Sequence, residues 1–376
     1  MANRFKSRTA VTGRIGETMY RATAEATANI ALVKYWGKRD EKLILPKEGS
    51  ISATMDEQLK TRTTVMFSDK FLKDELILNG KKMEGKDTEE RLQQLDVVRK
   101  KAGTNLKAKI VSLNCFPTAA GFASSAAGLA ALAVAAVAAL DLKVDSKELS
   151  ILSRLGSGSA CRSVLGGFVE WKKGCKADGS DSYAVQIAQS SHWPEFRNVI
   201  AIVESGKKKV SSRAGMKQTV ATSLLYPARL NYLPKLIENV KAAILNKDLP
   251  KLLEMVMRDS NNMHATMLDT WPPIMYLNDV SKEIIYAIHD YNTSAGEIKA
   301  GYTFDAGPNA HIFTIEKYVP EIKKILEEIE GVQKIMVCKI GNGPKILTAE
   351  RDHLIDENGN VKKHFFDETS GKLIVE

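Results

Sequence analysis

The segment FPTAAGFASSAAGLAALAVAAVAAL, residues 116–140, has residue types and a spacing that suit anion binding. A strand pattern over Lys107–Asn114 precedes a turn of small residues, and an alanine-rich helix is predicted over Ser125–Leu140. At the start of such a helix, unpaired N–H groups and the positive dipole end point toward an anion, and Gly121 lets the backbone approach it. Many buried helices begin in this way, so phosphate binding and plain core packing are equal alternatives here.

The same segment is not predicted to cross a membrane. It has no charged residue from Val111 to Leu140, and a spanning helix needs about 20 residues. However, its first third contains asparagine, proline, threonine, glycine and serine, and the remainder is mainly alanine, which gains little from lipid. We therefore expect a buried helix and no membrane partner.

Four further segments place polar groups where a soluble core does not need them: TANIALVKYWGKRD, LGSGSACRSVLGGFVEW, KKKVSSRAGMKQTVATS and GYTFDAGPNA. In the first, alternation places Ala28, Ile30 and Leu32 on one face of a strand and Asn29 on the other. The polar residues of the four segments are Asn29, Lys34, Lys38, Arg39, Ser157, Ser159, Arg162, Ser211, Ser212 and Asp305.

Each of these residues also has a purely structural explanation. Lys34 can extend its ammonium from a strand end to solvent, and Ser211 can cap a helix. Asp305 can bond its own turn, and Arg162 can form a structural ion pair. Their occurrence together in one chain favours a functional site.

The secondary structure that must position these residues is predicted to be mostly strands in the front half of the chain and long helices with strands in the back half. Strands are predicted in the front half over 22–36, 61–67, 107–114, 166–171 and 198–203, with a hairpin turn at Asn79-Gly80. A helix is predicted to open with Asp87 and Glu90 at capping-box spacing and to end at Gly103, and another covers 146–155. The back half is predicted to contain helices over 229–246, 249–267, 274–291 and 319–330, and strands over 298–304, 309–313 and 334–339.

This order of elements predicts an α+β fold of two lobes with a deep cleft between them. We expect an N-terminal extension over 1–21, a lobe with the phosphate loop over 22–190, and a lobe carrying Asp305 over 191–376. A loop is predicted over 173–191, where glycine, aspartate and serine accumulate.

The composition excludes several classes of protein. The 376 residues are 44% hydrophobic and 26% charged, as in soluble globular proteins. The net charge is +9, but basic residues are scattered among acidic ones without an aromatic ladder, so we expect no nucleic-acid partner. Four cysteines without a CxxC pair argue against a disulfide framework or a zinc site and fit a reducing cytoplasm. His264 and His311 form no metal-spaced pair and are predicted to be structural.

The quoted segments, with FPTAAGFASSAAG and RDSNNMHATMLDTWPPIMYLND, resemble the signature blocks of the diphosphomevalonate decarboxylases. That family belongs to the superfamily of galactokinase, homoserine kinase, mevalonate kinase and phosphomevalonate kinase, whose two-lobed fold is therefore implied. The blocks follow the family's order from about Ala22 to the closing IGNGP segment. One departure is Phe122, where the superfamily usually has leucine, and we expect it to adjust the loop without loss of function.

The resemblance implies ATP-dependent decarboxylation of a phosphorylated mevalonate, with Mg2+ and a catalytic set of Asp305, Lys34 and Arg162. It implies that the substrate is contacted by Asn29, Tyr35, Lys38, Ser157, Ser159, Arg162, Ser211 and Met216. It implies that the nucleotide is contacted by Ala119, Ala120, Gly121, Ala123, Ser124, Ser125 and Ser211, with Ser124 and Ser125 near ATP-bound Mg2+. Relatives suggest a homodimer.

Three other functions stay open at this point. A decarboxylase acting on the monophosphate would use the same aspartate, lysine and arginine. A kinase that phosphorylates only the 3-hydroxyl has less need of all three. A basic nucleic-acid binder without ATP turnover would show steeply salt-dependent binding.

Overall fold

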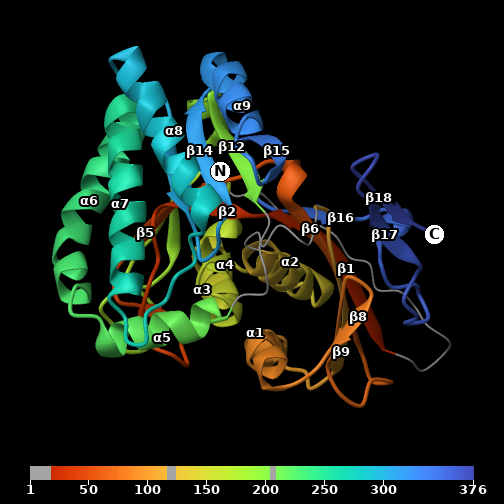
Figure 1. Ribbon diagram of the computed structural model, residues 1–376. Coiled ribbons are helices and arrows are strands. Elements are labelled where there is room, and N and C mark those ends of the chain that lie inside the picture. The colour runs from red at the N-terminus through yellow and green to blue at the C-terminus, as the bar shows by residue number, and fades with distance from the viewer. Residues whose placement is uncertain (1–17, 117–123, 204–208) are drawn as a thin grey trace.

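The computed structural model describes residues 18–116, 124–203 and 209–376 (Figure 1). It has the predicted α+β composition, with three main sheets and with helices packed against them. In the view of Figure 1, the helices α6, α7 and α8 lie on one side of the molecule, and the long strands β1, β6 and β9 lie on the other.

The largest sheet has six strands in the order β16-β1-β6-β9-β7-β8. Their bounds are Lys345–Leu347, Met19–Thr27, Lys60–Ser68, Lys107–Asn114, Glu75–Leu78 and Lys81–Met83. The strand predicted over 107–114 is confirmed with the same bounds. The predicted hairpin turn is also confirmed, because Asn79 and Gly80 join β7 to β8 with φ angles of 49° and 75°.

Helix α2 (Ser124–Ala139) packs against β1 and β6 of this sheet, as expected of an alanine-rich helix that is apolar on nearly every side. The other helices of this region are α1 (Lys86–Ala102), α3 (Ser146–Gly156) and the single turn α4 (Ala160–Ser163). The predicted cap of α1 is wrong: the helix starts after Gly85, so Asp87 is already inside its first turn. Its predicted end is confirmed, because Gly103 adopts the left-handed conformation that closes the helix.

A second sheet has the order β11-β10-β5-β2, with bounds Ala184–Ala188, Phe168–Trp171, Ser50–Thr54 and Asn29–Val33. The single strand predicted over 22–36 is therefore two strands in two different sheets. The chain changes sheets at Ala28, whose N–H donates to Leu59 O and whose carbonyl accepts from Met55 N. The loop predicted over 173–191 contains β11. The short strands β3 (Lys38–Asp40) and β4 (Leu45–Pro46) pair with each other in a two-stranded sheet.

The third sheet has the order β13-β14-β12-β15, with bounds Gly301–Phe304, Ala310–Ile315, Phe196–Val203 and Val332–Lys339. The helices of this lobe are α5 (Ser212–Thr222), α6 (Tyr226–Asn246), α7 (Leu249–Leu268), α8 (Asp279–Ala295) and α9 (Val319–Glu327). Helix α8 starts five residues later than predicted, because Asn278 caps it after a segment with two prolines. Within the described ranges, no helix combines the length and apolar character that crossing a bilayer requires.

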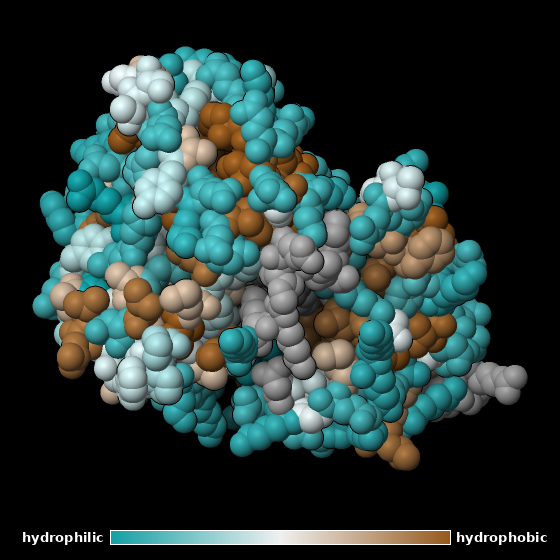
Figure 2. Space-filling view, viewed as in Figure 1, coloured by the Kyte–Doolittle hydropathy of each residue, from teal (hydrophilic) through white to brown (hydrophobic). Residues whose placement is uncertain are grey.

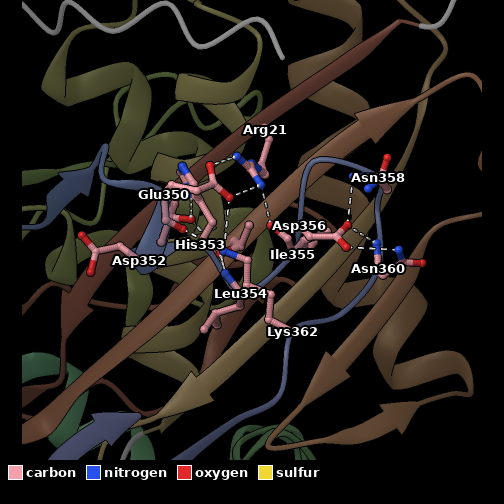
Figure 3. A network of polar contacts seen from close by, with 12 residues as sticks. Arg21, Glu350, Asp352, His353, Leu354, Ile355, Asp356, Asn358, Asn360 and Lys362 are labelled. Atoms are coloured by element: carbon pink, nitrogen blue, oxygen red, sulfur yellow. Dashed lines mark hydrogen bonds and ion pairs between the residues drawn. The ribbon is translucent and has the colours of Figure 1, made fainter. Parts of the chain in front are cut away.

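The last part of the chain returns to the first sheet. Strand β16 pairs with β1, and β17 (His364–Asp367) and β18 (Lys372–Val375) form a hairpin beyond it. The buried Arg21 of β1 donates to Glu350 at 3.1 and 2.5 Å and to the carbonyl of Ile355 at 2.7 Å. Figure 3 shows these contacts from close by. The Nδ1 atom of His353 lies 2.7 Å from Thr23 Oγ1.

Most of the surface drawn in Figure 2 is hydrophilic, and brown hydrophobic residues form small groups between teal ones. The cores lie between the sheets and their helices. One core joins the second sheet to α6 and α7, so that the two lobes share it. This shared core fixes the second sheet, which carries Asn29 and leads to Lys34, against the helices of the other lobe.

Candidate active site

A cavity of about 650 Å³ lies where the second sheet, α4, α5 and the segment after β13 meet. Every predicted substrate-contacting and catalytic residue lines it: Asn29, Lys34, Tyr35, Lys38, Ser157, Ser159, Arg162, Ser211, Met216 and Asp305. These residues are separated by up to 276 positions in the sequence, so their convergence depends on the fold.

Lys34 and Asp305 form an ion pair at the floor of the cavity. Lys34 follows the last residue of β2, Asp305 follows β13, and their Nζ and Oδ1 atoms are 2.7 Å apart. The lysine side chain is 2% exposed and the aspartate side chain 40% exposed. The carboxylate therefore faces the cavity, and the ammonium is held behind it in a less polar environment.

Arg162, in the short helix α4, is buried and held by neutral groups. Its Nε donates to Asn29 Oδ1 at 3.1 Å and to Ser52 Oγ at 3.0 Å, and its Nη1 donates to Ser50 Oγ at 2.6 Å. Among the described residues, none of its ion pairs or hydrogen bonds uses Nη2. Burial lowers the pKa of its guanidinium, but arginine stays protonated. The Nη1–Nη2 end of the group is left for an anionic ligand.

Another wall of the cavity carries hydroxyl groups and the ammonium group of Lys38. Ser157 Oγ and Ser159 Oγ are 3.2 Å apart on either side of Gly158, and the buried Tyr35 hydroxyl has no partner among the described residues. Burial and, to a smaller extent, the charge of Glu41 raise the pKa of Tyr35, so this phenol is a neutral donor. Lys38 contacts Glu41.

The N-terminal end of α2 reaches the same cavity through Ser125, and the N-terminal end of α5 reaches it through Ser211. Ser211 Oγ accepts from Ala214 N at 3.2 Å, so this serine is the predicted helix cap as well as a cavity residue. Of the predicted phosphate loop, Ala119, Ala120, Gly121, Phe122, Ala123 and the side chain of Ser124 lie outside the part of the chain that the structure describes.

The charges of the cavity suit a ligand with several negative charges. Its cations outnumber its carboxylates, because Asp305 is the only acidic residue of the described lining and the basic ones are Lys34, Lys38, Arg91, Arg162 and Arg213. Two helix N-termini add to this positive potential. Among the described residues, no group of three or more His, Cys, Asp or Glu side chains is placed to hold a metal ion.

Sequence reasoning missed several residues of this site. Ser50 and Ser52 are alternate residues of β5, and nothing in an ordinary strand sequence marks them as partners of Arg162. Arg213 directly follows Ser211 and Ser212 in KKKVSSRAGMKQTVATS, and its position beside two predicted site residues could have indicated that it lines the cavity. Arg91 lies on α1, outside every quoted segment, and Met263 lies on α7 within RDSNNMHATMLDTWPPIMYLND, where an apolar residue in a helical pattern does not indicate a site.

The two histidines predicted to be structural are both poorly exposed to solvent. His311 Nδ1 lies 3.2 Å from Asn198 Nδ2, and burial lowers its pKa to about 4. His264 Nε2 lies 3.4 Å from the carbonyl of Phe304, and burial, with the charge of Lys34 second, lowers its pKa to about 4. Both rings are therefore neutral near pH 7.

Comparisons with known proteins identify the family of the chain. A family model for the diphosphomevalonate decarboxylase-like N-terminal domain matches residues 26–184, and one for the mevalonate 5-diphosphate decarboxylase C-terminal domain matches residues 198–330. The diphosphomevalonate decarboxylase of Candida albicans is 45% identical over 357 positions, covering 87% of this chain and 98% of that protein.

Solved structures are similar along most of the chain. The crystal structure of mevalonate diphosphate decarboxylase from Staphylococcus aureus has a TM-score of 0.82 and 40% identity, covering 88% of this chain and 99% of that one. A structure of MDDEF in complex with MVAPP, AMPPCP and magnesium has a TM-score of 0.81 and 38% identity, covering 88% of this chain and 100% of that one.

The lobes, their sheets and the cleft between them define the class of protein: the chain has the two-lobed α+β fold of the small-molecule kinase superfamily. Within this class, the two matched models cover most of the chain. The chain belongs to the diphosphomevalonate decarboxylase family.

Proposed function

We propose that the protein converts (R)-5-diphosphomevalonate and ATP into isopentenyl diphosphate, ADP, phosphate and CO2, a step of the mevalonate pathway of isoprenoid biosynthesis. The observation that carries the proposal is the Lys34–Asp305 ion pair in the same cavity as the Nη1–Nη2 end of Arg162. The Asp305 carboxylate of the pair can bind the tertiary hydroxyl of the substrate, and the Arg162 guanidinium can bind the carboxylate of the substrate. The bound MVAPP, AMPPCP and magnesium of the similar MDDEF structure support the same substrates.

The reaction has to turn a tertiary hydroxyl into a leaving group. The hydroxyl oxygen attacks the γ-phosphorus of ATP and loses its proton, which releases ADP. The C–O bond then breaks and phosphate leaves with its electron pair, while the electrons of the bond to the carboxylate form the double bond and CO2 departs.

The residues on the floor of the cavity match these needs. Asp305 orients the hydroxyl and is placed to accept its proton, and its charge favours the cation that develops as phosphate leaves. Lys34 faces the transferring phosphoryl group. Arg162 holds the substrate carboxylate by two parallel hydrogen bonds until CO2 departs.

The cavity wall that carries the hydroxyl groups and Lys38 would bind the terminal phosphates of the substrate. Tyr35 has an unused buried hydroxyl, Ser157 and Ser159 add two more, and Lys38 adds a charge. Asn29 and Ser211 would lie where substrate and nucleotide meet, with Met216 packed beside them.

The nucleotide would bind between the N-terminal ends of α2 and α5. Ser125 lines the cavity there, and helix N-termini bind phosphate groups readily. We propose that Ala119, Ala120, Gly121, Ala123, Ser124 and Ser125 contact the nucleotide phosphates. Mg2+ bound to ATP would neutralise charge on the transferring phosphoryl group, with Ser124 and Ser125 near it.

Release of ADP and CO2 by the purified protein, measured in parallel with Mg-ATP and either 5-diphosphomevalonate or 5-phosphomevalonate, tests the proposal. We expect equal amounts of both products with the diphosphate and little of either with the monophosphate. Preference for the monophosphate would identify a phosphomevalonate decarboxylase, and ADP without CO2 would identify a 3-kinase. The Asp305→Asn variant should release neither product while still binding the substrate.

We also infer that the protein is a cytoplasmic homodimer, with lobes over 22–190 and 191–376 after an extension over 1–21. The four cysteines, none of them in a disulfide, support a reducing compartment. Residues 345–347 pair with β1 in the first sheet, so this late segment of the chain is added to the first lobe. Light scattering coupled to size-exclusion chromatography tests the dimer, because a mass of one chain would contradict it.

A further inference from the structure

Helix α7 carries a fully buried carboxylate that reaches the backbone of Lys34. Asp259 Oδ2 accepts from Lys34 N at 2.6 Å, and Asp259 Oδ1 accepts from Arg229 Nη1 at 2.9 Å and from the Tyr232 hydroxyl at 3.1 Å. Neither side chain of the Asp259–Arg229 ion pair has any exposure to solvent.

Arg229, from helix α6, also contacts the backbone of Lys34. Its Nη2 donates to Lys34 O at 3.1 Å, and its Nη1 also donates to Asn262 Oδ1 at 2.7 Å. One ion pair therefore binds both the N–H and the carbonyl of Lys34, which stands just beyond the end of β2 and outside the sheet ladder. Burying an ion pair carries a desolvation cost, which the hydrogen bonds of both side chains offset in part.

The residue after Asp259 on the same helix holds the other half of the catalytic pair. Ser260 Oγ accepts from Phe304 N at 3.0 Å, and Phe304 directly precedes Asp305. His264, one turn further along α7, faces the carbonyl of Phe304 at 3.4 Å. Two consecutive residues of one helix thus contact the backbone of Lys34 and the backbone of Phe304, next to Asp305, although these segments follow strands of different sheets.

We propose that Asp259, Ser260 and Arg229 are positioning residues, which set the distance between the Lys34 ammonium and the Asp305 carboxylate. Of these three, none lines the cavity. Asp259 and Arg229 act through the backbone of Lys34, and Ser260 acts through the backbone N–H of Phe304, the residue before Asp305. A rigid helix bridging the two segments holds the two charged groups in place before the substrate arrives. This inference rests on the proposed function.

The test compares Asp259→Asn with the wild-type enzyme. The amide has the same size but only one acceptor oxygen, so it cannot accept from both Lys34 N and Arg229 Nη1. Either the N–H of Lys34 loses its acceptor, or Arg229, which binds the carbonyl of Lys34, loses its own. We expect kcat for ADP and CO2 release to fall about 10- to 100-fold, while the affinity for 5-diphosphomevalonate measured by calorimetry changes less than about 3-fold.

Asp74→Asn is the matched control. Asp74 is a partly buried acid paired with Arg99 in the first lobe, away from the cavity. We expect it to lower the thermal unfolding midpoint without changing kcat. A normal kcat in Asp259→Asn, or a loss of substrate affinity equal to its loss of kcat, would overturn the proposal.

Ser260→Ala provides a second variant if Asp259→Asn does not fold. It removes one acceptor only, and we expect kcat to fall about 3- to 10-fold with unchanged affinity.

Crystal structures of wild type and variant give a readout that needs no turnover. We expect the Nζ–Oδ1 distance of Lys34 and Asp305 to lengthen beyond hydrogen-bond range in Asp259→Asn, and an unchanged distance would refute the positioning role. A wild-type protein without decarboxylase activity would refute the proposed function alone.

Discussion

Substitution of Arg162 by lysine tests the carboxylate clamp most directly, because it keeps the charge and removes the planar fork. The guanidinium uses Nε and one Nη1 hydrogen for Asn29, Ser52 and Ser50. One ammonium cannot satisfy these three acceptors and also bind a carboxylate through two parallel hydrogen bonds.

The size of the effect follows from the contacts that are lost. A hydrogen bond between charged groups contributes about 1.5–3 kcal/mol, so losing one of two to the substrate carboxylate, and weakening the other, costs about 3 kcal/mol. That corresponds to a fall of about 150-fold in kcat/KM. Polar atoms left without partners in the buried site lower the free energy of unfolding by about 1–3 kcal/mol in addition.

The assay is the release of CO2 and ADP as a function of 5-diphosphomevalonate concentration, together with urea unfolding. Arg154→Lys is the control, because Arg154 is also a buried arginine but donates to the carbonyls of Leu43, Gly179 and Ser182 instead of facing the cavity. It should lose stability and keep kcat/KM. If Arg162→Lys keeps kcat/KM within about 3-fold of wild type, Arg162 does not clamp the carboxylate.

Three further predictions concern the phosphate wall and the C-terminal return. A Cβ at Gly158 would lie 2.8 Å from the ring of Trp171 and 2.8 Å from the ring of Tyr35. Gly158→Ala should therefore displace Tyr35 and raise KM for the diphosphate about 10-fold, and an unchanged KM would argue against a role for that phenol. Glu41 competes with substrate phosphate for Lys38, so Glu41→Gln should lower KM about 2- to 5-fold at constant kcat, and a higher KM in steady-state assays would contradict this. Burial lowers the pKa of His353 to about 4, so the folded protein binds fewer protons than the unfolded chain below about pH 6.5, and stability falls as the pH is lowered. Between pH 7 and pH 5, His353→Gln should lose about 2 kcal/mol less unfolding free energy than wild type in urea titrations, and equal losses would disprove the linkage.

The sequence was sufficient to predict the residues whose chemistry is unusual for their surroundings. Lys34 at the end of a hydrophobic strand, Arg162 among glycines and Asp305 before a Gly-Pro turn all line one cavity. The periodicity of α2 and of the strand over 107–114 was equally informative, because a continuous apolar pattern has few alternative structures.

The sequence was not sufficient where tertiary contacts decide the role of a residue. Asp259 has the position of an ordinary polar residue in a helical pattern, and only the fold brings it to the backbone of Lys34. The change of sheets at Ala28 depends on hydrogen bonds to distant residues, which strand periodicity does not encode. Strand β11 was missed because β-propensity is weak beside glycine, aspartate and serine.

The pairing of β16 with β1 has a consequence for synthesis on the ribosome. About 320 residues separate the two strands, which at roughly 5–20 residues per second take roughly 16–64 s to translate. Throughout this interval the outer edge of β1 lacks its native neighbour, although β6 and β9 are already available to pair. An unpaired edge strand is a site for association with other chains. The nascent protein therefore depends on residues 345–347 to cover the outer edge of β1, and a chain stalled or truncated before them would expose that edge.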